Sequence, residues 1–215
     1  MASSTVHLAI TNELLKIRSF KDPDRLRFGA LVVDWGDKKA AHRVMLLDNG
    51  ERKVYDLDSF RRLFGEKIAE DDLYMGYYLH LVQDLLYRHF VYAEHGWIPL
   101  PENVKKLHRD YSIVNKYIIP KYELKNDLVI PFGFENEALN RLCCFDTQKM
   151  LKDLHTYFTV QEEGEVFFFT KEMTDDYIKR AVGLCLKELE SLEKGETSID
   201  LLGYAWENHS KNKSK

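Results

Sequence analysis

His80, Asp84 and Arg88 are the residues of this 215-residue chain whose types and spacing best suit chemistry. They stand four positions apart, so on a helix their side chains form one row. A carboxylate one turn from an imidazole can fix the histidine tautomer, as an oriented base or a pair of metal ligands requires. The spacing also suits an ordinary helix face, because aspartate four residues before arginine is a favourable ion-pair order.

The architectural interpretation of this row is favoured, because no second segment of the sequence carries a recognisable set of ligands. We therefore predict no metal site and no cofactor, and we expect the row to serve the helix and not reactivity. An alternative hypothesis is a small metal-dependent or small-molecule enzyme in which His80 and Asp84 are the catalytic residues.

His95 and Trp97 form a second candidate group, in an aromatic region that ends before two prolines. Aromatic side chains with histidines can line a ligand pocket or anchor a partner protein in a groove. More often, such residues fill the core. We keep both as predicted interaction residues.

Glu162, Glu163 and Glu165, followed by Lys171, resemble in outline the carboxylates and lysine of metal-dependent nucleases. Such sites need a further acidic ligand beside the same strand to hold magnesium, and none is apparent. Because the glutamates flank Gly164, they are more simply interpreted as the solvated tip of a hairpin.

The overall charge disfavours nucleic acid as a partner, because the formal net charge is -4 and the pI is about 6.1. The most basic part of the chain contains Lys38, Lys39 and Arg43. Basic residues at sheet edges keep strands from pairing with other molecules, which is the simpler explanation. Nucleic-acid contact through these three residues is a second alternative function.

Cysteine usage and the first residues of the chain predict an intracellular protein, with the cytoplasm as its expected location. The three cysteines show no CxxC spacing, and the N-terminal stretch lacks the features of a signal peptide. Residues 73–92 are long enough to span a membrane, but His80, Asp84 and Arg88 would be costly in lipid. We therefore predict no membrane span.

An antiparallel meander of three strands is predicted over residues 28–57. Residues 28–35 and 42–47 are rich in β-branched and large apolar residues, which favour strands. Asn49-Gly50 then supplies the positive φ angles of a tight hairpin that leads into the third strand.

Further elements follow from hydrophobic period and turn residues. Alternation around Gly164 predicts a second hairpin over residues 159–170, and residues 121–132 are expected to form one or two strands. Apolar residues three and four positions apart predict helices over residues 6–17, 58–68, 73–92, 101–120, 136–158 with a break near 145, 174–194 and 198–205.

Together these elements predict a single α+β domain over residues 1–207, with about six helices around a central apolar helix, followed by a polar tail at 208–215. For function we predict a protein-binding module without catalytic activity, acting as an adaptor, a regulator or a subunit of a larger assembly. The reason is that caps, turns and helix faces account for most of the polar residues. The sequence does not identify the partner protein or any small-molecule ligand.

Overall fold

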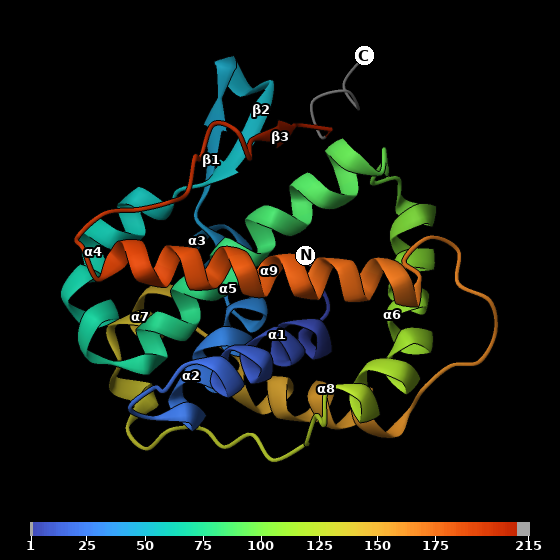
Figure 1. The fold of residues 1–215 in the computed structure, drawn as a ribbon, viewed down its shortest axis with the longest axis horizontal. Helices are drawn as coiled ribbons and strands as arrows, with labels where there is room; N and C mark the ends of the chain where they lie inside the picture. The colour runs from blue at the N-terminus through green and yellow to red at the C-terminus, as the bar shows by residue number, and fades with distance from the viewer. Residues whose placement is uncertain (1, 210–215) are drawn as a thin grey trace.

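The computed structural model describes residues 2–209, and it is mostly helical, with 66% helix and 5% strand (Figure 1). The predicted α+β class is therefore wrong. Of the polar tail predicted at 208–215, residues 210–215 lie outside the described residues.

Helix α5 (Asp72–Arg88) lies at the centre of the fold and is buried along nearly its whole length. It continues into a π-helical turn, η3 (His89–Glu94). Helices α2 (Pro23–Val32) and α9 (Lys171–Leu192) pack against α5, and α9 crosses in front of it in Figure 1. Helix α1 (Ser4–Ile17) packs against α2 and α9. The predicted central apolar helix is thus confirmed.

Two glycines allow α2 and α5 to cross at very short range. A Cβ atom on Gly29 would lie 2.1 Å from the carbonyl oxygen of Leu73, and one on Gly76 would lie 2.1 Å from that of Leu26. No side chain fits at either position, so the two backbones are in direct contact. The crossing fixes where the chain after α2 passes over α5.

Residues 28–35, predicted as the first strand of the meander, instead form the end of α2 and the short helix η1 (Val33–Trp35). The start of α2 explains the difference. The Asp22 side chain accepts hydrogen bonds from the backbone amides of Asp24 and Arg25, and Pro23 lies in the first turn. The β-branched residues that suggest a strand are buried in this helix, so tertiary packing overrides their propensity.

The only sheet among the described residues has three short strands in the order β1-β2-β3. The turn η2 (Asp48–Gly50) joins β1 (Val44–Leu47) to β2 (Arg52–Tyr55), which confirms the predicted hairpin. The third strand is β3 (Trp206–Glu207), which comes from the other end of the chain and pairs antiparallel with β2.

Residues 159–170, predicted as the second hairpin, form no strand. The buried carboxylate of Asp110 accepts hydrogen bonds from the backbone amides of Phe167, Phe168 and Phe169, at 2.7, 2.7 and 3.0 Å. One side chain therefore satisfies the amides that a partner strand would have bound.

Two other predicted segments are also irregular. Residues 122–132 form no strand, and Val129 within them is 66% exposed, because no neighbouring strand covers this stretch. Residues 198–205 form turns in place of the last predicted helix. There the buried carboxylate of Glu188 accepts hydrogen bonds from the backbone amide and the hydroxyl of Ser198, at 2.6 and 2.9 Å.

The other predicted helices are confirmed. They are α4 (Leu57–Glu70), α6 (Pro101–Lys121), and the pair α7 (Ala138–Cys143) and α8 (Thr147–Thr159), which has the expected break. Two short helices were not predicted, α3 (Lys38–His42) and η4 (Phe134–Asn136). Within residues 2–209, no helix has both the length and the apolar character needed to cross a membrane.

Candidate metal centre

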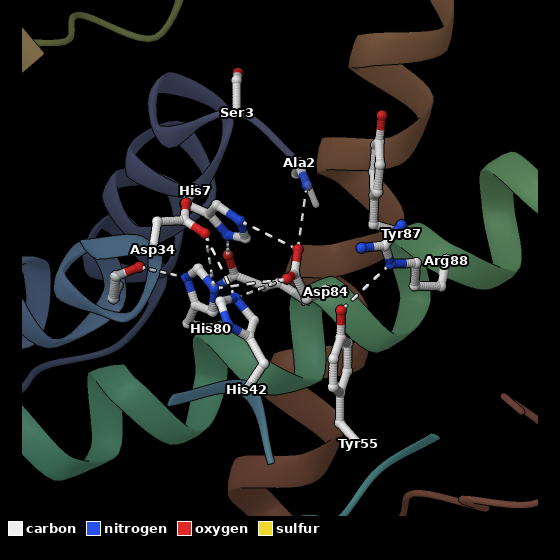
Figure 2. A network of polar contacts seen from close by, with 12 residues as sticks. Ala2, Ser3, His7, Asp34, His42, Tyr55, His80, Asp84, Tyr87 and Arg88 are labelled. Atoms are coloured by element: carbon white, nitrogen blue, oxygen red, sulfur yellow. Dashed lines mark hydrogen bonds and ion pairs between the residues drawn. The ribbon is translucent and has the colours of Figure 1, made fainter. Parts of the chain in front are cut away.

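His80 and Asp84, the pair singled out in the sequence, lie in the middle of α5, and their side chains are 0% exposed. The row is therefore not a solvated helix face. Three further ionisable residues, His7, Asp34 and His42, approach the pair from elements outside α5 (Figure 2). We call these five residues the His/Asp cluster.

His7 comes from α1, and its ring stacks on that of His80 with centroids 4.0 Å apart. Nδ1 of His7 donates a hydrogen bond to Oε1 of Gln83 at 2.7 Å, and Nδ1 of His80 donates one to the carbonyl oxygen of Ala30 at 2.8 Å. Both oxygens only accept, so the Nδ1 atoms carry the protons and each Nε2 is left toward the cluster. Metal-binding histidines are oriented by this kind of outer hydrogen bond.

Asp34 and His42 lie on η1 and α3, the two short helices that follow α2. Nε2 of His42 is 3.5 Å from Oδ1 of Asp34 and 3.6 Å from Oδ2 of Asp84. The close crossing of α2 and α5 brings this segment over His80, whose Nε2 is 3.9 Å from Oδ1 of Asp34. Residues far apart in sequence thus meet at one buried point.

Six buried polar atoms of the cluster have no hydrogen-bond partner within the described part of the chain. They are Nε2 of His7 and His80, both ring nitrogens of His42, Oδ1 of Asp34 and Oδ2 of Asp84. Buried polar groups are nearly always paired, and an unpaired one costs about 1–3 kcal/mol. Imidazole nitrogens and carboxylate oxygens that lie together without partners at hydrogen-bond distance form a candidate binding site for a cation.

The separations of the donor atoms fit a divalent metal ion. Nε2 of His7 is 3.4 Å from Oδ1 of Asp84, and Nε2 of His80 is 3.7 Å from Oδ2 of Asp84. Zinc bonds of about 2.0–2.1 Å place neighbouring ligands of a tetrahedral ion roughly 3.3–3.4 Å apart. These two distances, each to a different oxygen of Asp84, are close to the spacing of zinc ligands.

Two overlapping sets of three ligands are present, and in each set the donor atoms lie within 4.8 Å of one another. One set is His7, His80 and Asp84, and the other is Asp34, His42 and His80. His80 has a single free lone pair, so it can bind one ion. Two ions would need the carboxylate of Asp84 as a bridge, and its Oδ2 does lie near both His42 and His80.

The electrostatics of the cluster also favour a cation. Burial alone would raise the pKa of Asp84, but the neighbouring His7 and His80 hold it well below its usual range. Burial likewise opposes ionisation of Asp34, but His42, His80 and His7 outweigh it and lower its pKa. Both carboxylates are therefore anionic near neutral pH.

The pKa values of the two stacked histidines are shifted in opposite directions. Burial lowers the pKa of His7, but Asp84 and Asp34 outweigh this effect and raise it above its usual value. Burial and the charge of His7 lower the pKa of His80. The two carboxylates thus favour protonation of His7, while protonation of His80 is disfavoured.

Arg88, the third member of the predicted row, lies on the other side of Asp84 from the histidines (Figure 2). Nε of Arg88 donates to the hydroxyl of Tyr55 at 3.3 Å, and Nη1 donates to the hydroxyl of Tyr92. No ion pair joins it to Asp84, so the helix-face pair that the spacing favours does not form among the described residues.

The predicted interaction residues lie apart from the His/Asp cluster. Trp97 is only 7% exposed and stacks on Tyr92 with ring centroids 5.8 Å apart, whereas His95 is exposed beside Phe90. No partner chain is present to test either role, so both stay predictions.

The basic residues lie on α3 and just after it. Lys38 and Lys39 are exposed on this helix, whereas Arg43 donates two hydrogen bonds to the hydroxyl of Ser59, at 2.9 and 2.7 Å. Arg43 is thus already engaged within the protein. Nucleic-acid contact through these residues remains a prediction.

Two of the three glutamates near Gly164 pair with basic side chains. Glu162 pairs with Arg109 at 3.1 Å, and Glu163 pairs with Lys116 at 2.5 Å. Their charges are therefore balanced by surface ion pairs, in keeping with the interpretation as a solvated segment.

Sequence reasoning missed His7, Asp34 and His42. They belong to separate segments, and no spacing between them has a meaning until the chain is folded. A weak signal was present, because each is a polar residue next to apolar ones: Val6 and Leu8 flank His7, and Val33 precedes Asp34.

Comparisons of the chain with models of protein families, with curated proteins and with solved structures gave no match. Function is therefore inferred from the site alone.

Proposed function

We propose that this chain is a metal-dependent hydrolase and that the His/Asp cluster holds one or two divalent ions. Zinc is the best fit, because the donors are imidazole nitrogens and carboxylate oxygens near tetrahedral spacing. The observation that carries the proposal is the orientation of His7 and His80. Each ring is fixed through Nδ1 and leaves an unpartnered Nε2 beside the buried carboxylate of Asp84.

A catalytic role is favoured over a structural one by the number of ligands. Structural zinc sites are closed by four protein ligands, commonly cysteines, whereas catalytic sites have three and leave one position for water or substrate. Each ligand set here has three members, and none is a cysteine.

A divalent ion in such a site supplies Lewis acidity, which polarises the bond to be cleaved and acidifies a water molecule. The residues of the chain have separate tasks around it. Asp84 provides negative charge at the centre of the cluster, and Gln83 and the carbonyl of Ala30 orient the two stacked rings. The substrate bond best matched to this chemistry is an ester, an amide or a phosphoester.

Metal retention tests the proposal directly. The protein is stripped with a chelator, reloaded with zinc, passed through gel filtration and analysed by mass spectrometry for metal content. The wild type should retain one or two zinc ions per chain. His80→Gln should lose them, because His80 belongs to both ligand sets. His155→Gln is the matched control, because His155 is an exposed histidine on α8.

Hydrolysis is then measured on a panel of chromogenic esters, amides and phosphoesters. Activity should require the reloaded ion, disappear in His80→Gln and persist in His155→Gln. A wild-type protein that retains no divalent ion, or a His80→Gln variant that retains as much as the wild type, would refute the proposal. Circular dichroism of both variants verifies that they are folded.

A further inference from the structure

Arg88 is a cation beside the His/Asp cluster that forms no direct ion pair among the described residues, although the charge of Asp84 contributes to raising its pKa. Its guanidinium lies over the rings of Tyr92 and Trp206, with its central carbon 5.3 and 5.7 Å from their centroids. Among the described residues, no carboxylate lies within 4.0 Å of its nitrogens. Arginines removed from water are normally in direct contact with an anion, and Arg88 is not.

A second cation and a tyrosine hydroxyl lie near Arg88. Lys53 on β2 is close enough that, in addition to burial, the charge of Arg88 lowers its pKa. The hydroxyl of Tyr55 accepts a hydrogen bond from Arg88, and its own proton has no acceptor within residues 2–209. Tyr55 is 1% exposed, whereas Arg88 is partly exposed.

Arg88 also lies close to the His/Asp cluster. Arg88 follows Asp84 by one helical turn, which places the two side chains about 5–6 Å apart at Cβ. In Figure 2 the guanidinium projects toward Asp84, above the hydroxyl of Tyr55. A ligand bound to Arg88 would thus touch both the guanidinium and the edge of the metal site.

We propose that Arg88 and Tyr55 form an oxyanion-binding subsite, which takes a phosphate or carboxylate group of the substrate. A guanidinium presents several N–H donors in one plane, and this fork matches the oxygens of either group. The subsite restricts the substrate to compounds that carry an oxyanion within a few bonds of the bond to be cleaved. This inference rests on the proposed hydrolase function, because it assigns the substrate class of the same site.

Calorimetric titration with inorganic phosphate and with acetate tests the subsite, in zinc-loaded and in stripped protein. Replacing Arg88 by Gln should weaken anion binding by about 10- to 100-fold, as expected for the loss of charge-assisted hydrogen bonds. Zinc content should be unchanged in this variant. Arg180→Gln is the matched control, since Arg180 is engaged by Glu94 at the surface and should bind as the wild type does.

Phosphate and acetate distinguish two classes of substrate, those with a phosphate group and those with a carboxylate group. Arg88-dependent binding of both indicates a general oxyanion subsite, whereas binding of phosphate alone indicates a phosphoester substrate. Equal binding by Arg88→Gln and the wild type would overturn the proposal, as would a zinc-loaded wild type that binds neither anion.

The design separates this inference from the hydrolase proposal. If the wild type retains no zinc, the hydrolase proposal fails, and the stripped protein still tests whether anion binding depends on Arg88. If Arg88→Gln does not fold, Tyr55→Phe replaces it, because it removes only a hydroxyl. Weaker phosphate binding by that variant supports the subsite, and unchanged binding contradicts it.

Discussion

The proton on His7 sets the pH range in which the His/Asp cluster can accept a metal ion. Burial lowers the pKa of this histidine, but Asp84 and Asp34 outweigh it, so the pKa lies above the usual 6.5. In the metal-free protein this proton stabilises the folded state below pH 6.5, and the contribution is lost as the pH rises through the raised pKa. A metal ion must displace the same proton.

Zinc affinity should therefore keep rising above pH 6.5, by up to about tenfold per pH unit until His7 has lost its proton. Asp84 does not titrate in this range, because its pKa is held well below its usual value. Competition with a chromogenic chelator between pH 6.0 and 8.5 measures the slope. His155→Gln serves as the control and should give the same profile. An affinity that is flat above pH 6.5 would show that His7 does not hold the displaced proton.

At the scale of elements, the crossing of α2 and α5 is the contact that assembles the site. It depends on two glycines and carries Asp34 and His42 to the face of α5 that bears His80. A larger residue at the crossing would separate the helices, so the stability of the fold and the geometry of the cluster should change together.

Gly76→Ala should destabilise the protein by about 1–3 kcal/mol, the usual cost of overpacking a core. The added Cβ would lie 2.1 Å from the carbonyl oxygen of Leu26 and 2.9 Å from the backbone nitrogen of Ala30, and neither atom can move without shifting α2. Urea unfolding of the metal-free protein measures the change.

The control for this substitution is Gly183→Ala, an exposed glycine of α9 with nothing within 4 Å of the added Cβ. It should be neutral or stabilising by up to about 1 kcal/mol, because alanine has the higher helix propensity. Equal stability of the Gly76→Ala variant and the wild type would mean that the helices do not meet as closely as the structure places them.

Elements whose patterns are local could be predicted, and those decided by distant contacts could not. The apolar character of helix α5 and the turn at Asn49-Gly50 can both be predicted from residues that are neighbours in the sequence. The helix at residues 28–35 has a strand-like composition, and its burial against α5 determines its form. The hairpin expected at residues 159–170 is absent because Asp110 accepts hydrogen bonds from three of its backbone amides, which lie 57, 58 and 59 residues later in the chain.

The same distinction holds for the site. His80 and Asp84 could be found because they share one helix at a spacing with chemical meaning. The interpretation of the row as architectural depended on the lack of a second ligand segment. The missing ligands come from three segments, at His7, Asp34 and His42, that only the packing of α1 and α2 on α5 brings together.

At the scale of the whole molecule, the His/Asp cluster connects three segments of the first 84 residues that are separate in the sequence. His7 belongs to α1, Asp34 and His42 belong to the segment after α2, and the remaining two ligands belong to α5. An ion bound to either ligand set stabilises only the folded chain, since the unfolded chain does not hold these groups together.

Zinc should therefore raise the melting temperature substantially. An ion at 1,000 times its dissociation constant adds about 4 kcal/mol, and a chain of this size gains about 2–4 °C per kcal/mol, so we expect a rise of roughly 8–16 °C. Thermal unfolding followed by circular dichroism, with zinc and with chelator, measures the shift. It should vanish in His80→Gln, which lacks the ligand common to both sets, and persist in His155→Gln. An equal shift in the two variants would place the bound zinc elsewhere on the protein. Zinc bound in the His/Asp cluster needs His80, so its stabilising effect must depend on that residue.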